Sequence, residues 1–442
     1  MTTLHSDPRK DKINLEIYAP EASNPKAFYG LPDRVLFCSR CVISNQRPNS
    51  TVEHRHTNMS KKTTINFDQN NVCDACKVAD QKQDDIDWEE RRRELHTLCD
   101  KYRSRNGSYD CLVPGSGGKD SFYQSWILKY EFGMNPLTTT WAPHIHTEWG
   151  WRNFDRWIHS GFDNYLMTPN GRVKRLITRL AVENLFHPFQ PFIFGQKSLA
   201  PKIAEKFNIP LIFYGENEAE YGNPIADSAS AQRDYSFFSN TKDSDIYLGG
   251  TSIASLRENY GVRSVDLEVY RPSNPEDLRA KDIQVHYLGY YLKWHPQAAY
   301  YFAVENGGFE ASPERTPGTY SKYNSIDDRI DDLHYYTTFI KFGIGRATYD
   351  ASQEVRSNDI EREEGVALIR RYDGEFPDRF SNELMAYLSL PEKDFPVESA
   401  VFDEPIMDRD YFDALANRFR SPHLWSHQND KWQLRHTIFD NI

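Results

Sequence analysis

One short stretch constrains the fold of this chain more than any other. Residues 116–121 read Ser-Gly-Gly-Lys-Asp-Ser, directly after the strand-like run 109–114 and before an amphipathic segment that continues to about residue 131. A strand, a glycine-rich turn and a helix in this order form a cradle for phosphate, because glycine lets the backbone approach an anion and turn its N–H groups toward it. The stretch predicts an α/β fold with a phosphate-binding loop. An ordinary Ser/Gly turn between two elements is the alternative.

The side chains of this loop suit a phosphorylated ligand that carries a metal ion. Ser116 and Ser121 add hydroxyl groups, Lys119 adds a positive charge, and Asp120 is a candidate partner for Mg²⁺. The loop is not a Walker A sequence, because that sequence needs Ser or Thr after the lysine and here Asp follows it. We therefore expect a phosphate-binding loop of another class.

Strand-like and helix-like patterns alternate through the region around the loop. Such alternation predicts a parallel sheet with helices on both faces, in which ligands bind beyond the carboxyl ends of the strands. The strands are expected at 109–114, 137–142, 163–168 and 210–214, and the helices at 120–131, 148–160, 172–185 and 197–208. Further helices are expected at 326–342 and from a capping box formed by Asn358 and Glu361 to about residue 371.

Composition narrows the class of protein. The chain has 442 residues, 39% hydrophobic and 14% aromatic, which is enough for a globular protein of two or three domains. No apolar run approaches the ~20 residues that span a bilayer, and the N-terminus lacks the apolar core of a signal peptide. We therefore expect a cytoplasmic protein that does not associate with membranes. The net charge of -11 disfavours a large nucleic-acid-binding surface.

Four of the six cysteines form two Cys-x-x-Cys pairs, Cys38 with Cys41 and Cys73 with Cys76. In a reducing compartment such pairs are metal ligands more often than disulfides. Four thiolates suit one tetrahedral Zn²⁺, and the long polar spacer between the pairs must then bulge out as a loop. A redox role for either pair is the alternative. The spacer contains His54, which with His56 is either a further ligand or a solvated side chain. The remaining cysteines, Cys99 and Cys111, are expected to be buried thiols.

The loop and several other segments together resemble a known family. Ser-Gly-Gly-Lys-Asp-Ser matches the PP-loop signature of the ATP pyrophosphatase superfamily. The chain as a whole resembles one branch of it, the N-acetyl sugar amidotransferases of surface-polysaccharide and nonulosonic-acid (pseudaminic-acid type) biosynthesis, over roughly residues 36–380. The matching stretches are Phe-Cys-Ser-Arg-Cys-Val (37–42), Val-Cys-Asp-Ala-Cys (72–76), Val-Pro-Gly-Ser-Gly-Gly-Lys-Asp-Ser (113–121), 208–222, 341–356 and 362–375. Two features depart from the family: Gly115 stands where valine is common, and the spacer between the cysteine pairs is long.

The resemblance implies an enzyme that turns an acetamido group of a nucleotide-activated sugar into an acetamidino group, in the synthesis of lipopolysaccharide O-antigen or a related polymer. Such enzymes use ATP to adenylate the amide oxygen, and ammonia then displaces AMP. An amide oxygen is otherwise a poor leaving group, so the site must align it with the α-phosphate and exclude water. ATP, Mg²⁺ and Zn²⁺ are the implied cofactors.

The resemblance also assigns candidate residues. The loop residues Gly115, Ser116, Gly117, Gly118, Lys119, Asp120 and Ser121 are expected to hold the leaving pyrophosphate. Among them, Lys119, Asp120 and Ser121 are expected at the chemical step. Trp141 is expected near the adenosine, and Glu216 beside the nucleotide. Glu218, Lys341, Arg346 and Arg356 are candidates for binding the anionic sugar nucleotide. The alternatives are a solvated acidic turn for the glutamates, and pairing with Asp327, Asp328 and Asp350 for the cations.

The resulting organisation has five segments. We expect an irregular N-terminal arm at 1–35, a zinc-binding knuckle at 36–80, a connecting helix at 81–108, an ATP-binding α/β core at 109–225 and a mainly helical substrate-binding region at 226–442.

The source of ammonia is expected outside this chain. A glutaminase needs a nucleophilic cysteine in a glycine-flanked elbow or at the N-terminus, and the chain shows neither pattern. The resemblance implies a separate glutaminase subunit with a barrel-shaped, cyclase-like subunit that channels ammonia. A homo-oligomer is compatible with the sequence. The competing functions are a PP-loop enzyme that modifies tRNA by thiolation or lysidine formation, which the acidic charge disfavours, and a non-catalytic scaffold with a vestigial loop.

Overall fold

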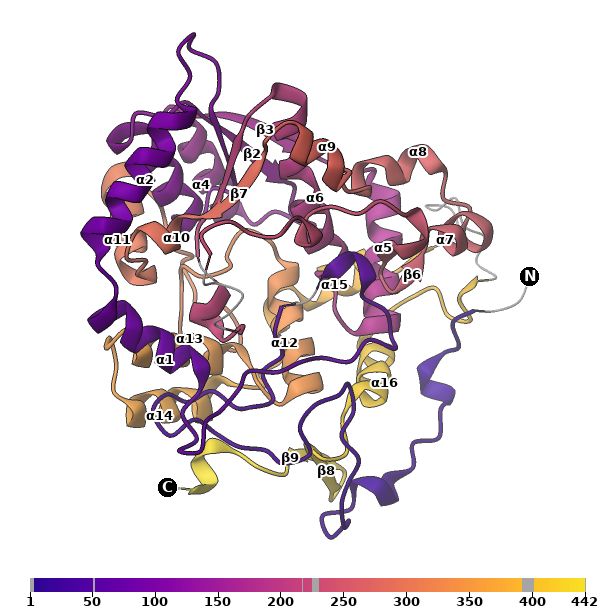
Figure 1. Ribbon diagram of the computed structural model, residues 1–442. Coiled ribbons are helices and arrows are strands. Elements are labelled where there is room, and N and C mark those ends of the chain that lie inside the picture. Colours follow the sequence, from indigo (N-terminus) through magenta and orange to yellow (C-terminus); the bar gives the residue numbers. More distant parts are fainter. Residues whose placement is uncertain (1–3, 51, 217, 225–229, 392–400, 442) are drawn as a thin grey trace.

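A five-stranded parallel sheet organises the fold, and in the view of Figure 1 it lies in the upper part of the molecule. The computed structural model describes residues 4–50, 52–216, 218–224, 230–391 and 401–441. In spatial order the strands are β3 (Asp163–Met167), β2 (Pro136–Trp141), β1 (Cys111–Pro114), β4 (Leu211–Tyr214) and β7 (Gln284–Tyr287). The register places Cys111 beside both Pro136 and Leu211. The α/β class and the parallel sheet predicted from the sequence are confirmed.

Helices cover both faces of the sheet because the central strands are buried on both sides. On one face Leu112 and Ile212 pack with the helices α5 (Gly171–Leu185) and α6 (Gln190–Phe207). On the other face Val113 packs with Cys111, Leu211 and Phe213 against three helices. These are α2 (Trp88–Tyr102), α3 (Lys119–Trp126) with the π-helical turn Ile127–Glu131, and α10 (Leu288–Tyr291). Adjacent strand residues thus enter different cores, as the two-residue period of a strand requires.

Two elements of the core differ from the prediction. Helix α6 begins at Gln190, seven residues before its expected start, and contains Pro191 in its first turn and Pro201 in its interior. Proline is favourable in the first turn of a helix, but in a sequence it usually indicates a helix boundary. The first turns of α6 were therefore not predicted. The fifth strand, β7, lies in the segment that was expected to be mainly helical. It is four residues long and carries Gln284 and His286, so it has little apolar signal.

The connections after β2, β4 and β7 carry further helices. These are α4 (Glu148–His159), α7 (Ile253–Tyr260), α8 (Ser264–Leu267), α9 (Pro275–Ala280) and α11 (Pro296–Gly307), with a small hairpin of β5 (Tyr247–Leu248) and β6 (Thr251–Ser252). Helix α11 packs against α3, and so forms an outer layer beside the loop.

The C-terminal region is helical and ends in a hairpin. Its elements are α12 (Ile330–Phe342), α13 (Arg346–Arg356), α14 (Arg362–Tyr372), α15 (Ser381–Leu388), α16 (Arg409–Phe419), β8 (Trp425–Gln428) and β9 (Lys431–Leu434). The predicted capping box is wrong: Glu361 precedes α14 without a side-chain cap bond, and Asn358 adopts φ +61 after α13. In the described part of the chain, no helix combines the length and apolar character needed to cross a membrane.

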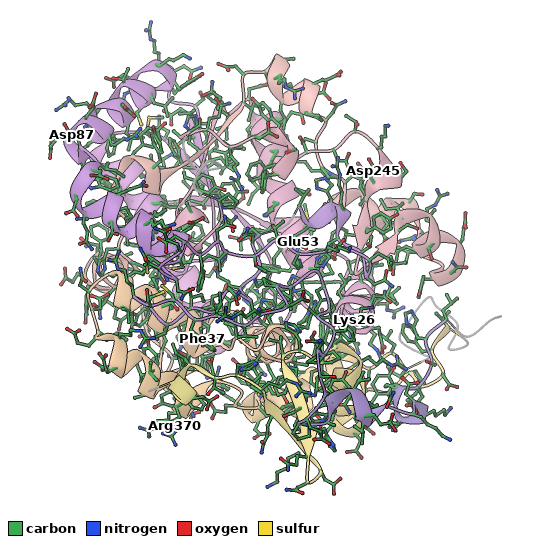
Figure 2. All side chains as sticks on the ribbon, turned by 60° about the horizontal axis from the view of Figure 1, so that its bottom comes forward. Lys26, Phe37, Glu53, Asp87, Asp245 and Arg370 are labelled. Atoms are coloured by element: carbon green, nitrogen blue, oxygen red, sulfur yellow. The ribbon has the colours of Figure 1, made fainter. Side chains whose placement is uncertain are left out.

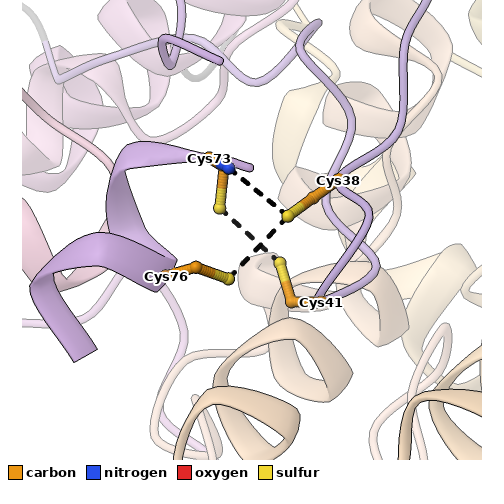
Figure 3. Close-up of side chains that lie close together, drawn as sticks. All are labelled: Cys38, Cys41, Cys73 and Cys76. Carbon is orange, nitrogen blue, oxygen red and sulfur yellow. Dashed lines mark hydrogen bonds between the residues drawn. The ribbon is translucent and has the colours of Figure 1, made fainter. Parts of the chain in front are cut away.

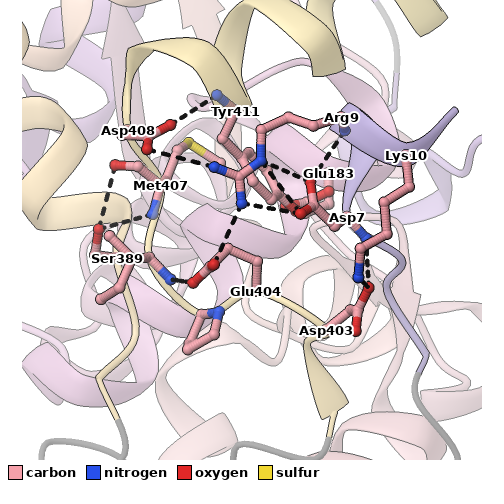
Figure 4. A network of polar contacts seen from close by, with 12 residues as sticks. Asp7, Arg9, Lys10, Glu183, Ser389, Asp403, Glu404, Met407, Asp408 and Tyr411 are labelled. Atoms are coloured by element: carbon pink, nitrogen blue, oxygen red, sulfur yellow. Dashed lines mark hydrogen bonds and ion pairs between the residues drawn. The ribbon is translucent and has the colours of Figure 1, made fainter.

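The described part of the N-terminal arm has little regular secondary structure and is held by ionic contacts (Figure 4). Short 3₁₀ turns occur at η1 (Pro8–Lys10) and η2 (Leu15–Tyr18). Arg9 pairs with Glu404 at 3.2 Å, and Lys10 pairs with Asp403 at 2.6 Å. The phenol of Tyr18 donates to the carbonyl oxygen of Arg420 at 2.9 Å. The N-terminal arm therefore packs against the segment 401–420 of the C-terminal region.

Candidate functional site

The glycine-rich loop connects the end of β1 to the start of α3. The amide of Gly115 donates to the carbonyl oxygen of Thr139 at 2.9 Å, which continues the sheet pairing into the loop. Helix α3 begins at Lys119 with Gly118 at the cap position, where no side chain satisfies the first-turn N–H groups. A helix N-terminus without a side-chain cap is suited to bind an anion.

Ser121 and Gly117 fix the shape of this loop. Gly117 has φ +85, and a Cβ on it would lie 2.5 Å from the Cα of Phe154 on α4. Its amide donates to Ser121 Oγ at 3.2 Å, and that hydroxyl donates to the carbonyl oxygen of Gly118 at 3.0 Å. Only glycine tolerates both the left-handed conformation and the close backbone approach. The Ser121 hydroxyl is thus engaged in holding the loop.

Lys119 and Asp120 form the charged part of the loop. Lys119 Nζ lies 2.6 Å from Asp120 Oδ2, and the lysine side chain is 6% exposed whereas the aspartate is 31% exposed. Both residues line a cavity of about 420 Å³ beyond the carboxyl ends of β1 and β4. The other lining residues come from the segment after β4, from residues before α12, and from α11, α12 and α13: Glu216, Tyr221, Pro296, Asn324, Ser325, His334, Tyr335, Thr338, Arg346, Tyr349, Asp350 and Gln353. We call this space the loop cavity.

Glu216 follows β4 and faces the loop across this cavity. Its carboxylate accepts a hydrogen bond from the phenol of Tyr221 at 3.0 Å, and Gln353 Nε2 donates to the same phenol at 3.2 Å. Burial, together with the negative charge of Asp120, raises the pKa of Glu216 to about 7, although Lys119 opposes the shift. A carboxyl group with such a pKa exchanges a proton near neutral pH.

Arg346 supplies the positive charge of the opposite wall. Its Nε lies 3.0 Å from Asp350 Oδ1, and its Nη1 donates to the phenol of Tyr335 at 2.6 Å. Burial lowers the pKa of Arg346, but Asp350 and Tyr335 outweigh this effect and raise it, so the guanidinium stays charged. Thr319 Oγ1 donates to Asp350 at 2.6 Å and fixes the carboxylate. Arg346 therefore both pairs with an aspartate and lines the cavity.

A single aspartate holds the N-terminus of α13, which carries Arg346. The carboxylate of Asp373 accepts from the amides of Gly345 and Thr348, each at 3.1 Å. A Cβ at position 345 would lie 2.5 Å from that carboxylate, so a side chain there would displace the carboxylate from these amides. This aspartate comes from the end of α14, so the position of Arg346 depends on how two helices pack.

Several predicted site residues lie away from the loop cavity. Lys341 is 5% exposed and donates to the carbonyl oxygen of Leu185 at 2.6 Å. Arg356 lies beside Cys41 and donates to the carbonyl oxygen of Glu220 at 3.3 Å. Trp141 is 2% exposed and packs with its ring 5.1 Å from that of Tyr270, in the core next to α6. The side chain of Glu218 lies outside the described part of the structure.

The sequence named Asp350 only as a pairing partner for the cations, and it did not single out Gln353, Tyr221 or Tyr335. Asp350 and Gln353 follow Arg346 at the i+4 and i+7 positions of α13, so helical periodicity within the stretch 341–356 was the available signal. Tyr221 and Tyr335 could not be identified from the sequence, because tyrosine is common in polar segments and does not by itself indicate a site.

The four paired cysteines converge on one point (Figure 3). Cys38 Sγ lies 3.8 Å from Cys76 Sγ, and Cys41 Sγ lies 3.7 Å from Cys73 Sγ. Four thiolates around Zn²⁺ with bonds of about 2.3 Å are spaced about 3.8 Å apart in a tetrahedron. All four are buried, and Cys73 directly precedes α1 (Asp74–Asp80). The cluster can therefore hold a metal ion, as predicted from the sequence.

The cluster packs against the C-terminal region. Arg362 at the start of α14 donates to the carbonyl oxygen of Cys41 at 3.3 Å, and Ile344 belongs to the same apolar cluster. His56 does not join the thiols but contacts Glu53, 3.0 Å away. A metal at the four thiols would thus tie the segment 36–80 to the helices that form one wall of the loop cavity.

Comparison with known families concerns the same C-terminal region. Residues 317–438 match the family model of the C-terminal domain of WbpG-like lipopolysaccharide-biosynthesis proteins. An uncharacterised protein of Methanocaldococcus jannaschii is 30% identical over 82 residues, which cover 19% of this chain and 28% of that protein. The chain thus spans less than a third of this relative. The matched domain contains α12 and α13, and it relates the chain to a family of polysaccharide-biosynthesis proteins.

Proposed function

We propose that this protein is an ATP-dependent amidotransferase of surface-polysaccharide biosynthesis. Its substrate is a nucleotide-activated N-acetyl sugar, whose acetamido group becomes an acetamidino group. The amide oxygen attacks the α-phosphorus of ATP and pyrophosphate leaves. Ammonia then adds to the imidate carbon, the nitrogen loses a proton, and AMP departs with the former amide oxygen.

One observation carries this proposal. The loop residues Lys119 and Asp120 share a cavity with Arg346, which lies in the domain that matches lipopolysaccharide-biosynthesis proteins. A phosphate-binding loop and a wall from a polysaccharide-biosynthesis domain are what an enzyme needs to bring ATP and an anionic sugar together. The acetamido chemistry itself rests on the sequence resemblance.

The residues of the loop cavity fit the steps of this reaction. The uncapped N-terminus of α3 and Lys119 suit the departing pyrophosphate, whose charge grows as the bond breaks. Asp120 is the partly exposed carboxylate that would hold Mg²⁺, which supplies charge neutralisation on the phosphates. Arg346 suits a phosphate or carboxylate of the sugar nucleotide. Glu216, with a pKa near 7, suits the proton that ammonia loses as it adds.

Zn²⁺ at the four thiols has a structural role in this proposal. Four protein ligands leave no position for a substrate, as in other closed zinc sites. Ammonia is supplied by a separate glutaminase subunit through a cyclase-like channel subunit, because no cysteine of this chain has the setting of a glutaminase nucleophile.

The test uses the purified full-length protein with ATP, Mg²⁺ and nucleotide-activated N-acetyl sugars. With ¹⁵N-ammonium at alkaline pH we expect AMP, pyrophosphate and a sugar in which one oxygen is replaced by ¹⁵NH, identified by mass spectrometry. With ¹⁵N-amide glutamine instead, the protein alone should give no labelled sugar. ADP as the product would contradict the assigned loop chemistry, and label from glutamine would contradict the need for a partner.

A further inference from the structure

A second group of metal-ligand side chains lies outside the loop cavity and the four thiols. Glu53, His56 and His187 place one ligand atom each within 4.8 Å of the others. Glu53 and His56 belong to the polar spacer between the cysteine pairs, at the 3₁₀ turn η3 (Glu53–Arg55), whereas His187 follows α5. In Figure 2, Glu53 projects onto the middle of the molecule, and it is 7% exposed. The fold has therefore brought this part of the spacer inward.

The distances show that the two imidazoles use different oxygens of one carboxylate. His56 Nδ1 lies 3.0 Å from Glu53 Oε2, and His187 Nε2 lies 3.9 Å from Glu53 Oε1. The first distance suits a hydrogen bond, but the second is too long for one. Both suit two ligands of one metal ion, because bonds of about 2.0–2.2 Å put neighbouring ligand atoms roughly 3–4 Å apart.

Among these three residues, His187 is the one whose buried ring nitrogens are not both satisfied by hydrogen bonds. Its Nδ1 is buried and has no hydrogen-bond partner among the described residues, and its Nε2 only approaches Glu53. A buried imidazole without partners is costly. An ion between Nε2 and the carboxylate would give Nε2 a ligand bond, whereas Nδ1 keeps no partner among the described residues.

These three residues line a cavity of about 180 Å³ that adjoins the loop cavity. His334, Thr338 and Tyr349 line both spaces, so a single layer of side chains separates them. Lys62 and Lys341 also line the smaller cavity, and Glu53 is the only carboxylate among its described lining residues. Two lysines beside a bound cation leave an excess of positive charge, which an anionic ligand balances.

We propose that Glu53, His56 and His187 bind a divalent transition-metal ion, separate from the ion of the four thiols, and that its open coordination position takes an anionic oxygen ligand. Two imidazoles and one carboxylate match the ligand set of three-residue zinc sites, which keep a position for water or substrate. A phosphate or carboxylate group would bind that position with Lys62 and Lys341. This inference stands independently of the amidotransferase reaction.

The first test is the metal content of the full-length protein, saturated with Zn²⁺ and separated from free metal. We expect two ions per chain in the wild type and one in Glu53→Gln or His187→Ala. Cys38→Ser should lose the other ion, and Cys99→Ala should keep both, because Cys99 is a buried thiol outside either cluster. One ion in the wild type, or two in folded Glu53→Gln, overturns the proposal.

A second test needs no variant. Co²⁺ added to the metal-free protein should give one equivalent with intense thiolate charge-transfer absorption and one with only weak ligand-field bands, as nitrogen and oxygen ligands produce. Inorganic phosphate should then shift the weak bands and leave the thiolate absorption unchanged. A single Co²⁺ equivalent contradicts the second metal site, and weak bands that ignore saturating phosphate contradict the anionic ligand.

Discussion

The four-thiol cluster and the loop cavity are assembled in opposite ways. The cluster takes its ligands from two short turns, Cys38–Cys41 and Cys73–Cys76, and its ligand set is complete within the segment 36–80. The loop cavity takes Lys119 and Asp120 from one strand–loop–helix unit, while the facing residues Tyr335 and Arg346 come from helices more than two hundred residues later in the chain. The first site is a local arrangement, and the second depends on how the C-terminal region docks on the sheet.

This difference predicts how each site fails. Binding of a metal to a local cluster contributes directly to folding, so its loss should appear as lost stability. We propose that the polar groups of the loop cavity bind the nucleotide and the sugar, so their loss should appear first as lost activity. The four predictions below test this contrast from the largest expected effect to the smallest.

The largest effect is expected at the four thiols. Cys38→Ser should lose the metal and lower the free energy of unfolding by more than about 4 kcal/mol, because three thiolates no longer close the site. Cys99→Ala is the matched control: it removes another buried thiol and should retain the metal. Elemental analysis with denaturant unfolding measures both. A Cys38→Ser protein with full metal content would contradict the four-thiolate site.

The second prediction concerns charge in the loop. Lys119→Ala and Asp120→Asn should each lower ATP cleavage to AMP at least about 100-fold, roughly 3 kcal/mol in the transition state. The unfolding midpoint should fall less than in Cys38→Ser, because Asp120 is 31% exposed and water can partly solvate the charge that is left unpaired. Asp277→Asn, at an exposed position on α9, serves as the control for loss of a carboxylate. Wild-type rates of ATP cleavage in these variants would show that the loop does not take part in the reaction.

The third prediction separates close packing from backbone conformation. Gly117 and Gly107 both have positive φ, +85 and +81, but a Cβ meets the Phe154 backbone only at position 117 and open space at 107. Gly107→Ala should cost about 1 kcal/mol of stability through backbone strain alone. Gly117→Ala should cost about 2 kcal/mol more and also abolish ATP cleavage, because α4 or the loop must shift. Equal costs at both positions would show that the loop does not need this contact.

The smallest effect is a pH dependence at Glu216. Its pKa in the folded protein, about 7, lies above the usual value of 4.5, so the folded state binds the proton more tightly. The stability it contributes is complete below pH 4.5 and is lost as the pH rises through 7. Glu216→Gln removes this loss, so its unfolding free energy relative to wild type should rise by about 1–3 kcal/mol between pH 5 and pH 8.

Urea unfolding midpoints at pH 5 and pH 8 measure this effect. Glu276→Gln, exposed on α9, controls for the change of net charge. An identical pH dependence in the wild type and in Glu216→Gln would mean that this carboxyl group is not shifted by burial and by Asp120.

Much of the core was predictable because its signals are local. The strand at Cys111–Pro114, the glycine turn and the helix from Lys119 lie within sixteen residues, and their periodicities do not depend on the rest of the chain. The polar strand β7 and the first turns of α6 were missed for the converse reason. The segment β7 is a strand because it pairs with β4. Helix α6 contains Pro191 and Pro201, which the sequence alone suggests as helix breaks.

The three candidate cations also show that the sequence does not reveal which site a side chain reaches. Lys341, Arg346 and Arg356 are equivalent candidates in the sequence, but they point to three different places. Lys341 reaches toward the end of α5, Arg346 lines the loop cavity, and Arg356 lies against the thiols. The break between α12 and α13 at Gly343, with φ +66, reorients the chain between the first two.

The sequence by itself determined the parallel α/β class, the glycine-rich loop between β1 and α3, and the four-thiol cluster, because each depends on short-range spacing and on distinctive residue chemistry. Only the tertiary structure decided which residues face the loop, since Arg346, Glu216 and Tyr335 meet through the packing of α12 and α13 over the carboxyl edge of the sheet. It also decided that part of the polar spacer turns inward and brings Glu53 and His56 to His187. Contacts between distant segments are fixed by the burial of whole helical faces, and no short stretch of sequence contains that information.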